Sequence, residues 1–190
     1  MLNIVIFGAP GSGKGTQSEQ IIADYGLNHI STGELLRDEI EKKSPEGIIA
    51  KSHIDKGHLV PDELINKMLT KELDDEKNKK GVILDGYPRT IPQAIALKKM
   101  LNERGTDVSI LLDLQVEEDV LVERLLNRGK QSGRSDDNLE IIKERLKVYH
   151  AKTEPLLDFY KHENKYEPIR GEDGITIIYS RIKDAIRKVR

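Results

Sequence analysis

The chain has 190 residues, with 31 basic and 33 acidic side chains and a formal net charge of −2. This length suits one compact domain with its own core, and the balanced charge predicts no general attraction to nucleic acid or to an anionic membrane. Because the sequence contains no cysteine, disulfides and thiolate metal sites are excluded.

The apolar run at residues 2–7 lacks the basic start and the length of a signal peptide. No stretch approaches the roughly 20 apolar residues that a transmembrane helix needs. The five histidines show no metal-binding spacing, and we interpret them as surface or packing residues. We therefore expect a cytoplasmic protein with no membrane partner.

The first predicted element is a strand at residues 2–7, LNIVIF, a β-favouring run typical of a strand buried on both faces of a parallel sheet. A glycine-rich loop follows, and a helix is predicted over residues 15–25. Further strands are predicted at residues 27–30, 81–85, 108–114 and 166–169, and further helices at residues 91–104, 117–128, 138–160 and 174–189. The alternation of strands and helices favours a doubly wound α/β fold for residues 1–190.

Two segments stand outside this alternation. Residues 41–60 are polar and contain glycine, and we expect a mobile insertion there. The stretch RGKQSGRSDDN, residues 128–138, has the composition of a short exposed loop.

The glycine-rich loop, GAPGSGKGTQ at residues 8–17, nearly fits the phosphate-binding template G-x-x-x-x-G-K-[ST]. Gly15 stands where the template has a hydroxyl for Mg²⁺, and the hydroxyl comes one residue later, at Thr16. Glycines let backbone N–H groups converge on phosphate oxygens, and Lys14 adds a positive charge. A chance glycine turn is the alternative, but the strand before the loop and the helix after it favour a phosphate site.

Asp85 ends the predicted strand GVILD. Mg²⁺ dehydrates reluctantly and often keeps several waters, so a metal held by phosphates needs only an acidic residue to orient one of those waters. Asp85 is our candidate for that role, with a helix cap or a turn residue as the alternative. No direct protein ligand to the metal is predicted.

Several arginines stand beside glycine turns or on one helix face. A single arginine is best explained by a solvated surface, and we keep that interpretation for Arg104, Arg181, Arg187 and Arg190. The remaining set exceeds what one bound nucleotide requires, because each guanidinium can grip a phosphate bidentately. Two phosphorylated ligands meeting head to head would use all of them, in a reaction that depends on positioning and electrostatics. The set is Arg37, Arg89, Arg124, Arg128, Arg134 and Arg145.

The motifs GAPGSGKGTQ, STGELLR, LVPDEL, DGYPRT with a following Gln93, RLLNRG and GRSDDN occur in this order over essentially the whole chain. On these motifs the sequence resembles the nucleoside monophosphate kinases, most closely the short-lid adenylate kinases. The resemblance implies a P-loop three-layer fold with a central five-stranded parallel sheet and helices on both faces. It implies reversible, Mg²⁺-dependent, in-line transfer between two bound nucleotides, ATP + AMP = 2 ADP, serving nucleotide homeostasis.

The resemblance also implies two closing segments, a monophosphate-binding flap at residues 31–60 and a short lid at residues 129–137. Their closure would exclude water and suppress ATP hydrolysis. The lid has only nine residues and no cysteine, so no structural zinc is expected. The charged surface leaves no apolar helix face for a partner, and we expect a monomer.

The family's site residues carry over by motif. The ATP phosphates would be held by Gly11, Ser12, Gly13, Lys14, Gly15 and Thr16, with Arg124 against the adenine, Arg128 near the phosphates and Gly171 near the adenine. AMP would be held by Thr32, Gly33, Arg37, Val60, Gly86, Arg89 and Gln93. Arg134 and Arg145 would close over the two reacting phosphates and would therefore also contact the phosphate of AMP. The catalytic set would be Lys14, Asp85, Arg89, Arg124, Arg128, Arg134 and Arg145, with Asp85 orienting a metal-bound water.

The acceptor base is inferred from Gln93, whose amide carries both a donor and an acceptor and so can pair with the adenine edge. A UMP/CMP kinase is the nearest alternative; those relatives usually carry asparagine near this place and Ser-Ala-Gly where this chain has Ser31-Thr32-Gly33. A slowly hydrolysing nucleotide switch is a second alternative, although the guanine-reading N-K-x-D tetrad is absent. A kinase with a non-nucleotide acceptor is a third, and it should lack the pair of Thr32 and Gln93.

Overall fold

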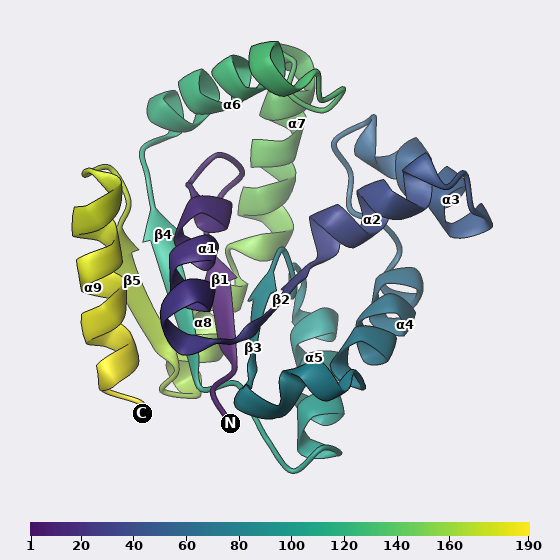
Figure 1. The fold of residues 1–190 in the computed structure, drawn as a ribbon. Coiled ribbons are helices and arrows are strands. Elements are labelled where there is room, and N and C mark those ends of the chain that lie inside the picture. The colour runs from purple at the N-terminus through teal and green to yellow at the C-terminus, as the bar shows by residue number, and fades with distance from the viewer.

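The computed structural model of the chain describes residues 1–75 and 78–190 with their side chains. Five parallel strands, β1 (Ile4–Phe7), β2 (Asn28–Ser31), β3 (Val82–Asp85), β4 (Ile110–Gln115) and β5 (Tyr166–Arg170), form one sheet in the order β2-β3-β1-β4-β5 (Figure 1). Each lies on or within two residues of a predicted strand. The five-stranded parallel sheet and the α/β fold are therefore confirmed.

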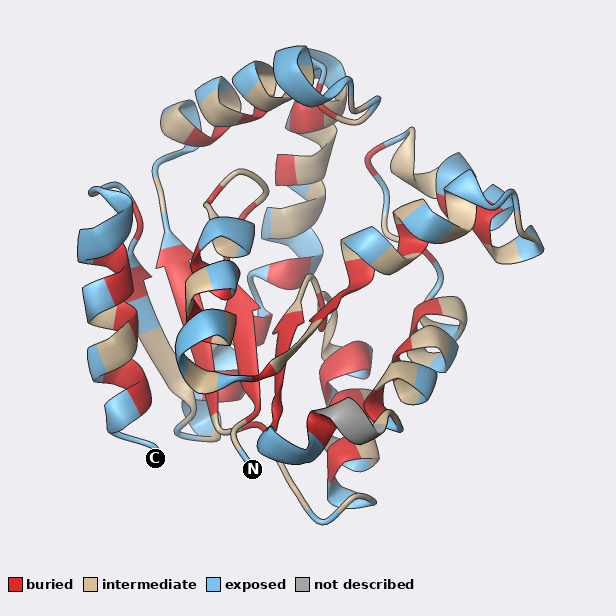
Figure 2. Cartoon of the chain, viewed as in Figure 1, coloured by how far each residue is buried: buried red, intermediate tan, exposed pale blue. Residues whose placement is uncertain are grey.

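Helices cover both faces of this sheet (Figure 1). Successive side chains of a strand point to opposite faces, so Ile4 and Ile6 pack in one core with α1 (Lys14–Tyr25) and α9 (Ile175–Arg187). Val5 and Phe7 pack in the other core with α5 (Ile91–Asn102) and α8 (Leu156–His162). Figure 2 shows the central strands as the buried layer between them. A continuous apolar run is thus what a strand covered on both faces requires.

Two groups of helices rise beyond the carboxyl ends of the strands (Figure 1). On one side, α6 (Glu118–Ser132) and α7 (Leu139–Val148) share a small core that includes Leu125 and Leu146. On the other side lie α2 (Thr32–Glu41) and α3 (Pro45–Ile54), while α4 (Asp62–Leu73) lies lower and packs in the same core as α5. A 3₁₀ helix, η1 (Glu76–Lys80), precedes β3. The space between the two groups opens onto the strand ends, where α/β proteins place their ligand sites.

The structure adds two helices that were not predicted, α2 and α4, and it departs from the predicted elements elsewhere. Most of the supposed insertion at residues 41–60 is helical: Ser44 caps α3 by accepting from the Gly47 N–H at 2.9 Å, and Pro45 occupies the first turn. The supposed loop at residues 128–138 begins later, because α6 continues to Ser132. The helix predicted over residues 138–160 is divided into α7, a π-helical turn η2 (Tyr149–Thr153) and α8. Pro155 stands at this division and cannot donate a backbone hydrogen bond.

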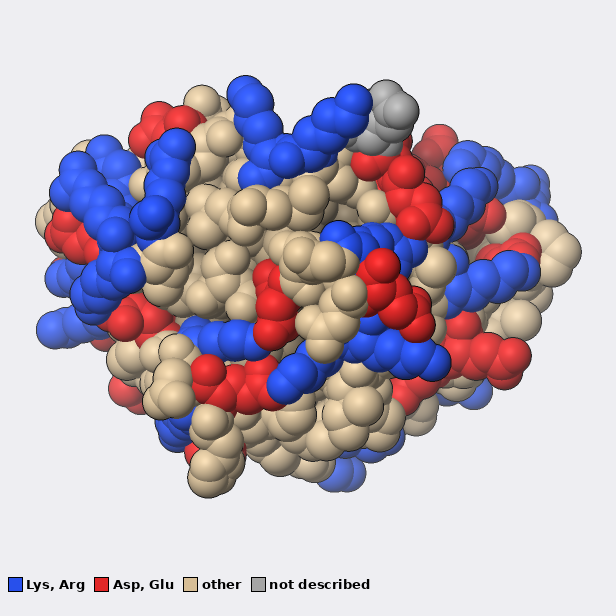
Figure 3. Space-filling view, turned by 90° about the horizontal axis from the view of Figure 1, so that it is seen from below, with Lys and Arg blue, Asp and Glu red and all other residues tan. Residues whose placement is uncertain are grey.

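Within the part of the chain that is described, no helix is both long and apolar enough to cross a membrane. Seen from below, the face at the amino ends of the strands carries acidic and basic side chains side by side (Figure 3). That face offers no continuous field of one sign to a polyanion.

We predict that Gly81→Ala destabilises the fold far more than Gly105→Ala. Both glycines have a positive φ, +123° and +68°, but a Cβ at Gly81 would lie 1.9 Å from the carbonyl oxygen of Leu2, whereas at Gly105 it would meet nothing within 4 Å. We expect losses of about 3 kcal/mol or more at Gly81 and about 1 kcal/mol at Gly105, measured by urea unfolding. Equal losses at the two positions would contradict this packing.

Candidate active site

A cavity of about 410 Å³ lies at the carboxyl ends of the strands, between the two groups of helices. A second cavity of about 720 Å³ opens at the far end of α1, beside Tyr25, Lys80 and Arg190, and none of the predicted site residues lines it. We place the candidate site in the first cavity because the charged groups converge there. The predicted residues that line it are Gly11, Gly13, Lys14, Gly15, Thr16, Thr32, Gly33, Arg37, Val60, Asp85, Gly86, Arg89, Gln93, Arg124, Arg128, Arg134 and Arg145.

Two predicted residues, Ser12 and Gly171, are not part of this lining. Ser12 is buried, its N–H donates to the carbonyl of Ala9 at 3.1 Å, and its hydroxyl faces the backbone of Gly8. The carbonyl of Gly171 accepts a hydrogen bond from Arg124 at 3.3 Å. Ser12 therefore packs inside the loop, and Gly171 lies beside the arginine predicted to meet the adenine.

The glycine-rich loop holds the ammonium of Lys14 in its own concave side. Lys14 Nζ donates to the carbonyl oxygens of Gly8 at 2.8 Å and Ala9 at 3.1 Å. Burial lowers the pKa of Lys14 to about 8; the charge of Asp85 raises it in part, and Arg89 lowers it further. Gly13 adopts a left-handed φ of 95° directly before α1, a conformation that glycine adopts without strain. The loop therefore lies at the N-terminus of α1, a position where helices commonly bind anions.

Asp85 lies where β3 ends, next to Ser31 of β2 in the register of the sheet. Burial would raise the pKa of Asp85, but His29 and the charge of Lys14 overcome that effect and hold the pKa below its usual value. The ring nitrogen of His29 lies 3.9 Å from the carboxylate, which is an ion-pair distance and too long for a hydrogen bond. The interpretation of the histidines as surface or packing residues missed this pairing, which only the parallel register of β2 and β3 produces.

Gln93 connects the residues predicted for the acceptor nucleotide. Its side-chain oxygen accepts from the backbone N–H of Arg89 at 2.7 Å, and its amide nitrogen donates to Asp62 at 2.6 Å. These two partners fix the orientation of the amide and leave one N–H and one lone pair for a ligand. Asp62, at the start of α4, was not predicted from the sequence.

Arg89 itself is turned back onto the loop that carries it. Its Nε donates to the carbonyl of Gly86 at 2.7 Å, and the hydroxyl of Thr32 donates to the same oxygen at 2.9 Å. The charge of Arg37 is close enough to lower the pKa of Arg89, after the larger effects of burial and Arg145. Burial and the neighbouring charge of Arg134 in turn lower the pKa of Arg37. The acceptor side therefore combines two arginines with an amide whose orientation is fixed.

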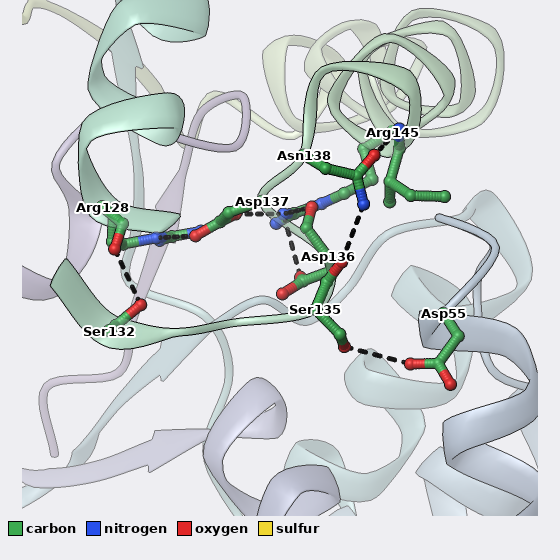
Figure 4. Close-up of polar contacts among 9 residues, drawn as sticks. Asp55, Arg128, Ser132, Ser135, Asp136, Asp137, Asn138 and Arg145 are labelled. Atoms are coloured by element: carbon green, nitrogen blue, oxygen red, sulfur yellow. Dashed lines mark hydrogen bonds and ion pairs between the residues drawn. The ribbon is translucent and has the colours of Figure 1, made fainter. Parts of the chain in front are cut away.

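The arginines of α6 and α7 meet at one aspartate (Figure 4). Arg128 donates to both carboxylate oxygens of Asp137, at 2.6 and 2.7 Å, and Arg145 donates to one of them at 2.9 Å. The Asp137 side chain is fully buried. Burial would raise the pKa of Asp137, but its bonds with Arg128 and the nearby charges hold it low. Asp137 was not assigned a role from the sequence, although the acid pair in GRSDDN could have indicated one.

The loop after α6 also reaches across the cavity. The hydroxyl of Ser135 donates to Asp55, the residue that follows α3, at 3.1 Å (Figure 4). The contact is exposed to solvent. It joins the predicted lid to the predicted flap.

No group of three or more histidine, aspartate or glutamate side chains arranged for a metal ion occurs among the described residues. Asp85 is nonetheless an ionised carboxylate on the cavity wall. Such a group can hold a metal through water when phosphates supply the other oxygens.

Comparison with known proteins identifies the same family along the whole chain. A sequence model described as adenylate kinase matches residues 6–165. The adenylate kinase of Parabacteroides distasonis is 64% identical over 190 residues, and that of Bacteroides thetaiotaomicron is 59% identical over 189 residues, with complete coverage of both chains in each case. The adenylate kinase of Porphyromonas gingivalis W83 is 53% identical over all of this chain and 98% of the relative.

We predict that phosphate binding depends on the charge of Lys14. With a pKa near 8 in the free protein, Lys14 is increasingly neutral above pH 8, while a bound phosphate favours the charged form. Affinity for a nucleoside triphosphate should fall as pH rises through 8, and binding at pH 8.5 should take up protons. Calorimetry in two buffers of different ionisation heat measures that uptake.

Lys14→Arg and Lys14→Met are the matched variants for this measurement. The arginine variant keeps its charge to pH 9 and should lose the pH dependence, while the methionine variant should lose the proton uptake and much of the affinity. An uptake of the same size in wild type and Lys14→Met would assign it to another group.

Proposed function

The chain belongs to the adenylate kinase family, and we propose how the residues of its cavity perform the reaction of that family. The protein is a phosphotransferase that converts ATP and AMP reversibly into two ADP. The observation that carries the residue assignment is the convergence of five cationic groups on one cavity, those of Lys14, Arg37, Arg89, Arg128 and Arg145. Two phosphorylated ligands need that much positive charge.

The donor nucleotide is assigned to the glycine-rich loop. Residues 11–16 offer backbone N–H groups to its phosphates, and the N-terminus of α1 adds its dipole. Lys14 exchanges the carbonyls of Gly8 and Ala9 for phosphate oxygens. The hydrogen bond from Arg124 to Gly171 supports placing the adenine beside these two residues.

AMP is assigned to the opposite wall. Arg37 and Arg89 hold its phosphate, and Thr32, Gly33, Val60 and Gly86 shape the surface beneath it. The free N–H and lone pair of Gln93 match the N1 and N6–H groups of adenine. Since both groups come from one amide held by Arg89 and Asp62, this arrangement favours AMP over UMP, whose base reverses the donor and the acceptor. The preference for AMP over CMP rests on the family to which the chain belongs.

In the transfer step, an oxygen of the AMP phosphate forms a bond to the γ-phosphorus of ATP. The bond from that phosphorus to the β-bridging oxygen breaks, and ADP leaves with the electron pair. The AMP phosphate is largely ionised at pH 7, so the protein need not remove a proton. Its contribution is to position both phosphates and to neutralise their charge with Lys14, Arg89, Arg128, Arg134 and Arg145.

Adenylate kinases are generally Mg²⁺-dependent. Bound Mg²⁺ neutralises phosphate charge and helps to orient the transferred group. Asp85 is assigned to hold one of its waters, because its carboxylate is ionised, lies on the cavity wall and is close enough to Lys14 for their charges to interact. Direct coordination by the protein is not required for a metal held by two nucleotides.

Residues 31–60 and residues 129–137 are proposed as the two segments that close over the nucleotides, and the Ser135–Asp55 contact supports their meeting. Closure leaves AMP as the available acceptor in place of water. Residues 129–137 contain no cysteine, and we propose no structural zinc for this lid. We propose that the enzyme acts as a cytoplasmic monomer, with ATP, AMP and ADP as its partners.

We predict that Arg89→Ala lowers kcat/KM for AMP by roughly 10²–10³-fold, the range found when one charge-stabilising donor is removed from an active site. The reason is that Arg89 is assigned to the phosphate of AMP. Coupled-enzyme kinetics with AMP varied at saturating Mg·ATP measure the effect. Arg104→Ala is the control, because Arg104 pairs with Asp74 outside the cavity and should leave kcat/KM unchanged. Near-normal turnover of Arg89→Ala would remove Arg89 from the site.

We predict that Gln93→Asn weakens the use of AMP more than that of ATP, because the shorter side chain cannot reach both Asp62 and the adenine. Transfer from Mg·ATP to AMP, CMP, UMP and GMP, with a control lacking acceptor, measures specificity in both proteins. Wild type should turn over AMP far faster than the other three, and the variant should lose that preference. Equal losses on the AMP and ATP sides would reject the role of Gln93, and ADP release without an acceptor would indicate a hydrolase.

A further inference from the structure

We propose that Thr153 is a positioning residue for Arg89, an inference that rests on the assignment of Arg89 to the AMP phosphate. The hydroxyl of Thr153 donates to the backbone carbonyl of Arg89 at 2.9 Å. Thr153 is 6% exposed, and it borders the cavity. The contact joins two segments that are 64 residues apart in the sequence.

This hydrogen bond completes the fixation of Arg89. The N–H of Arg89 donates to Gln93, its Nε donates to Gly86, and its carbonyl accepts from Thr153. The backbone of Arg89 is thus held from both sides, and its side chain is held at one nitrogen. A guanidinium held in this way keeps its remaining N–H groups directed at a phosphate without having to be ordered when the ligand binds.

The π-helical turn η2 is what brings Thr153 to this place. Arg145, Tyr149 and Thr153 follow one another at intervals of four residues, and all three border the cavity. In an α-helix, a step of four residues exceeds one full turn by about 40° around the helix axis. Two such steps would place Thr153 about 80° around the axis from Arg145. In η2 the N–H of Glu154 reaches the carbonyl of Tyr149, five residues back, at 2.9 Å. The extra residue in this turn reduces the drift and returns Thr153 to the face of Arg145.

The same geometry sets the spacing of two like charges. Arg145 and Arg89 lie close enough for the charge of Arg145 to lower the pKa of Arg89, after the larger effect of burial. Thr153 ties the chain segment of Arg145 to the backbone of Arg89. It therefore holds two mutually repelling arginines in one arrangement before the phosphates arrive, and π-turns are frequent at functional sites.

The test compares Thr153→Val, which keeps the shape and removes the hydroxyl, with Thr153→Ser, which keeps the hydroxyl. Thr70→Val is the matched control, because its hydroxyl donates to the carbonyl of Asn66 in its own helix at 2.9 Å, outside the cavity. We expect Thr153→Val to lower kcat/KM for AMP by about tenfold, the loss that follows when one buried hydrogen bond is removed. The KM for ATP should change little, while the thermal midpoint should fall by a few degrees because the buried carbonyl of Arg89 loses its partner. Thr153→Ser should recover most of the activity, and Thr70→Val should resemble wild type.

A double-mutant cycle with Arg89→Lys separates this inference from the assignment of Arg89. If Thr153 acts through Arg89, the effect of Thr153→Val should become smaller in the Arg89→Lys background. An undiminished effect there, equal losses for AMP and ATP, or no rescue by serine would overturn the positioning role. If Arg89→Lys by itself left AMP kinetics unchanged, the assignment of Arg89 would fail, and the role of Thr153 with it.

Discussion

The structure depends on one electrostatic constraint: several cations must share a cavity before any phosphate is bound. Lys14, Arg89 and Arg145 lie close enough for each to disfavour the charged form of another. Each is held by an oxygen of the protein, from the loop carbonyls, from Gly86 or from Asp137. The carboxyl edge of the parallel sheet supplies the carbonyls of Gly8, Ala9 and Gly86, which follow β1 and β3, and the loop between α6 and α7 supplies Asp137. The cations of this cavity are thus already oriented, which is the condition for large electrostatic stabilisation of a bound anion.

Asp137 neutralises the guanidinium groups that phosphates are expected to meet. Its fully buried carboxylate bonds with Arg128 and Arg145 together. Removing one member of a buried ion pair is costly, because the remaining charge is left without a partner. A phosphate that draws either arginine away must supply at least equal compensation, and a dianion does so better than a neutral group. Asp137 therefore holds Arg128 and Arg145 in one arrangement, and only a strongly anionic group can compensate either arginine for leaving it.

The sheet could be predicted from the sequence because its signal is local. β1, β3 and β4 are apolar runs that end where turn residues begin, and burial on both faces allows no polar alternation. The π-turn at Tyr149–Thr153 could not be predicted, because the residues on either side continue a helical pattern. It differs from an α-helical turn only in that the N–H of Glu154 bonds to the carbonyl five residues back. The same limit applies to His29 beside Asp85 and to Asp137 beside Arg145, pairs that depend on register and on distant packing. The sequence motifs predicted a set of arginines that does line one cavity, but they did not predict which groups hold those arginines in place.

Two hydrogen bonds of different strength join segments that border the cavity, one at its exposed rim and one where the protein is buried. Ser135 and Asp55 meet at the exposed rim, where water competes for both groups and the bond contributes little. Thr153 meets the carbonyl of Arg89 at the buried floor, where breaking the bond leaves a backbone oxygen without a partner. We therefore propose that the rim opens at small cost to admit and release nucleotides, while the bond from Thr153 keeps the arrangement of Arg89 and Arg145. On this proposal, the difference in burial between the two contacts separates a mobile entrance from a fixed set of charges.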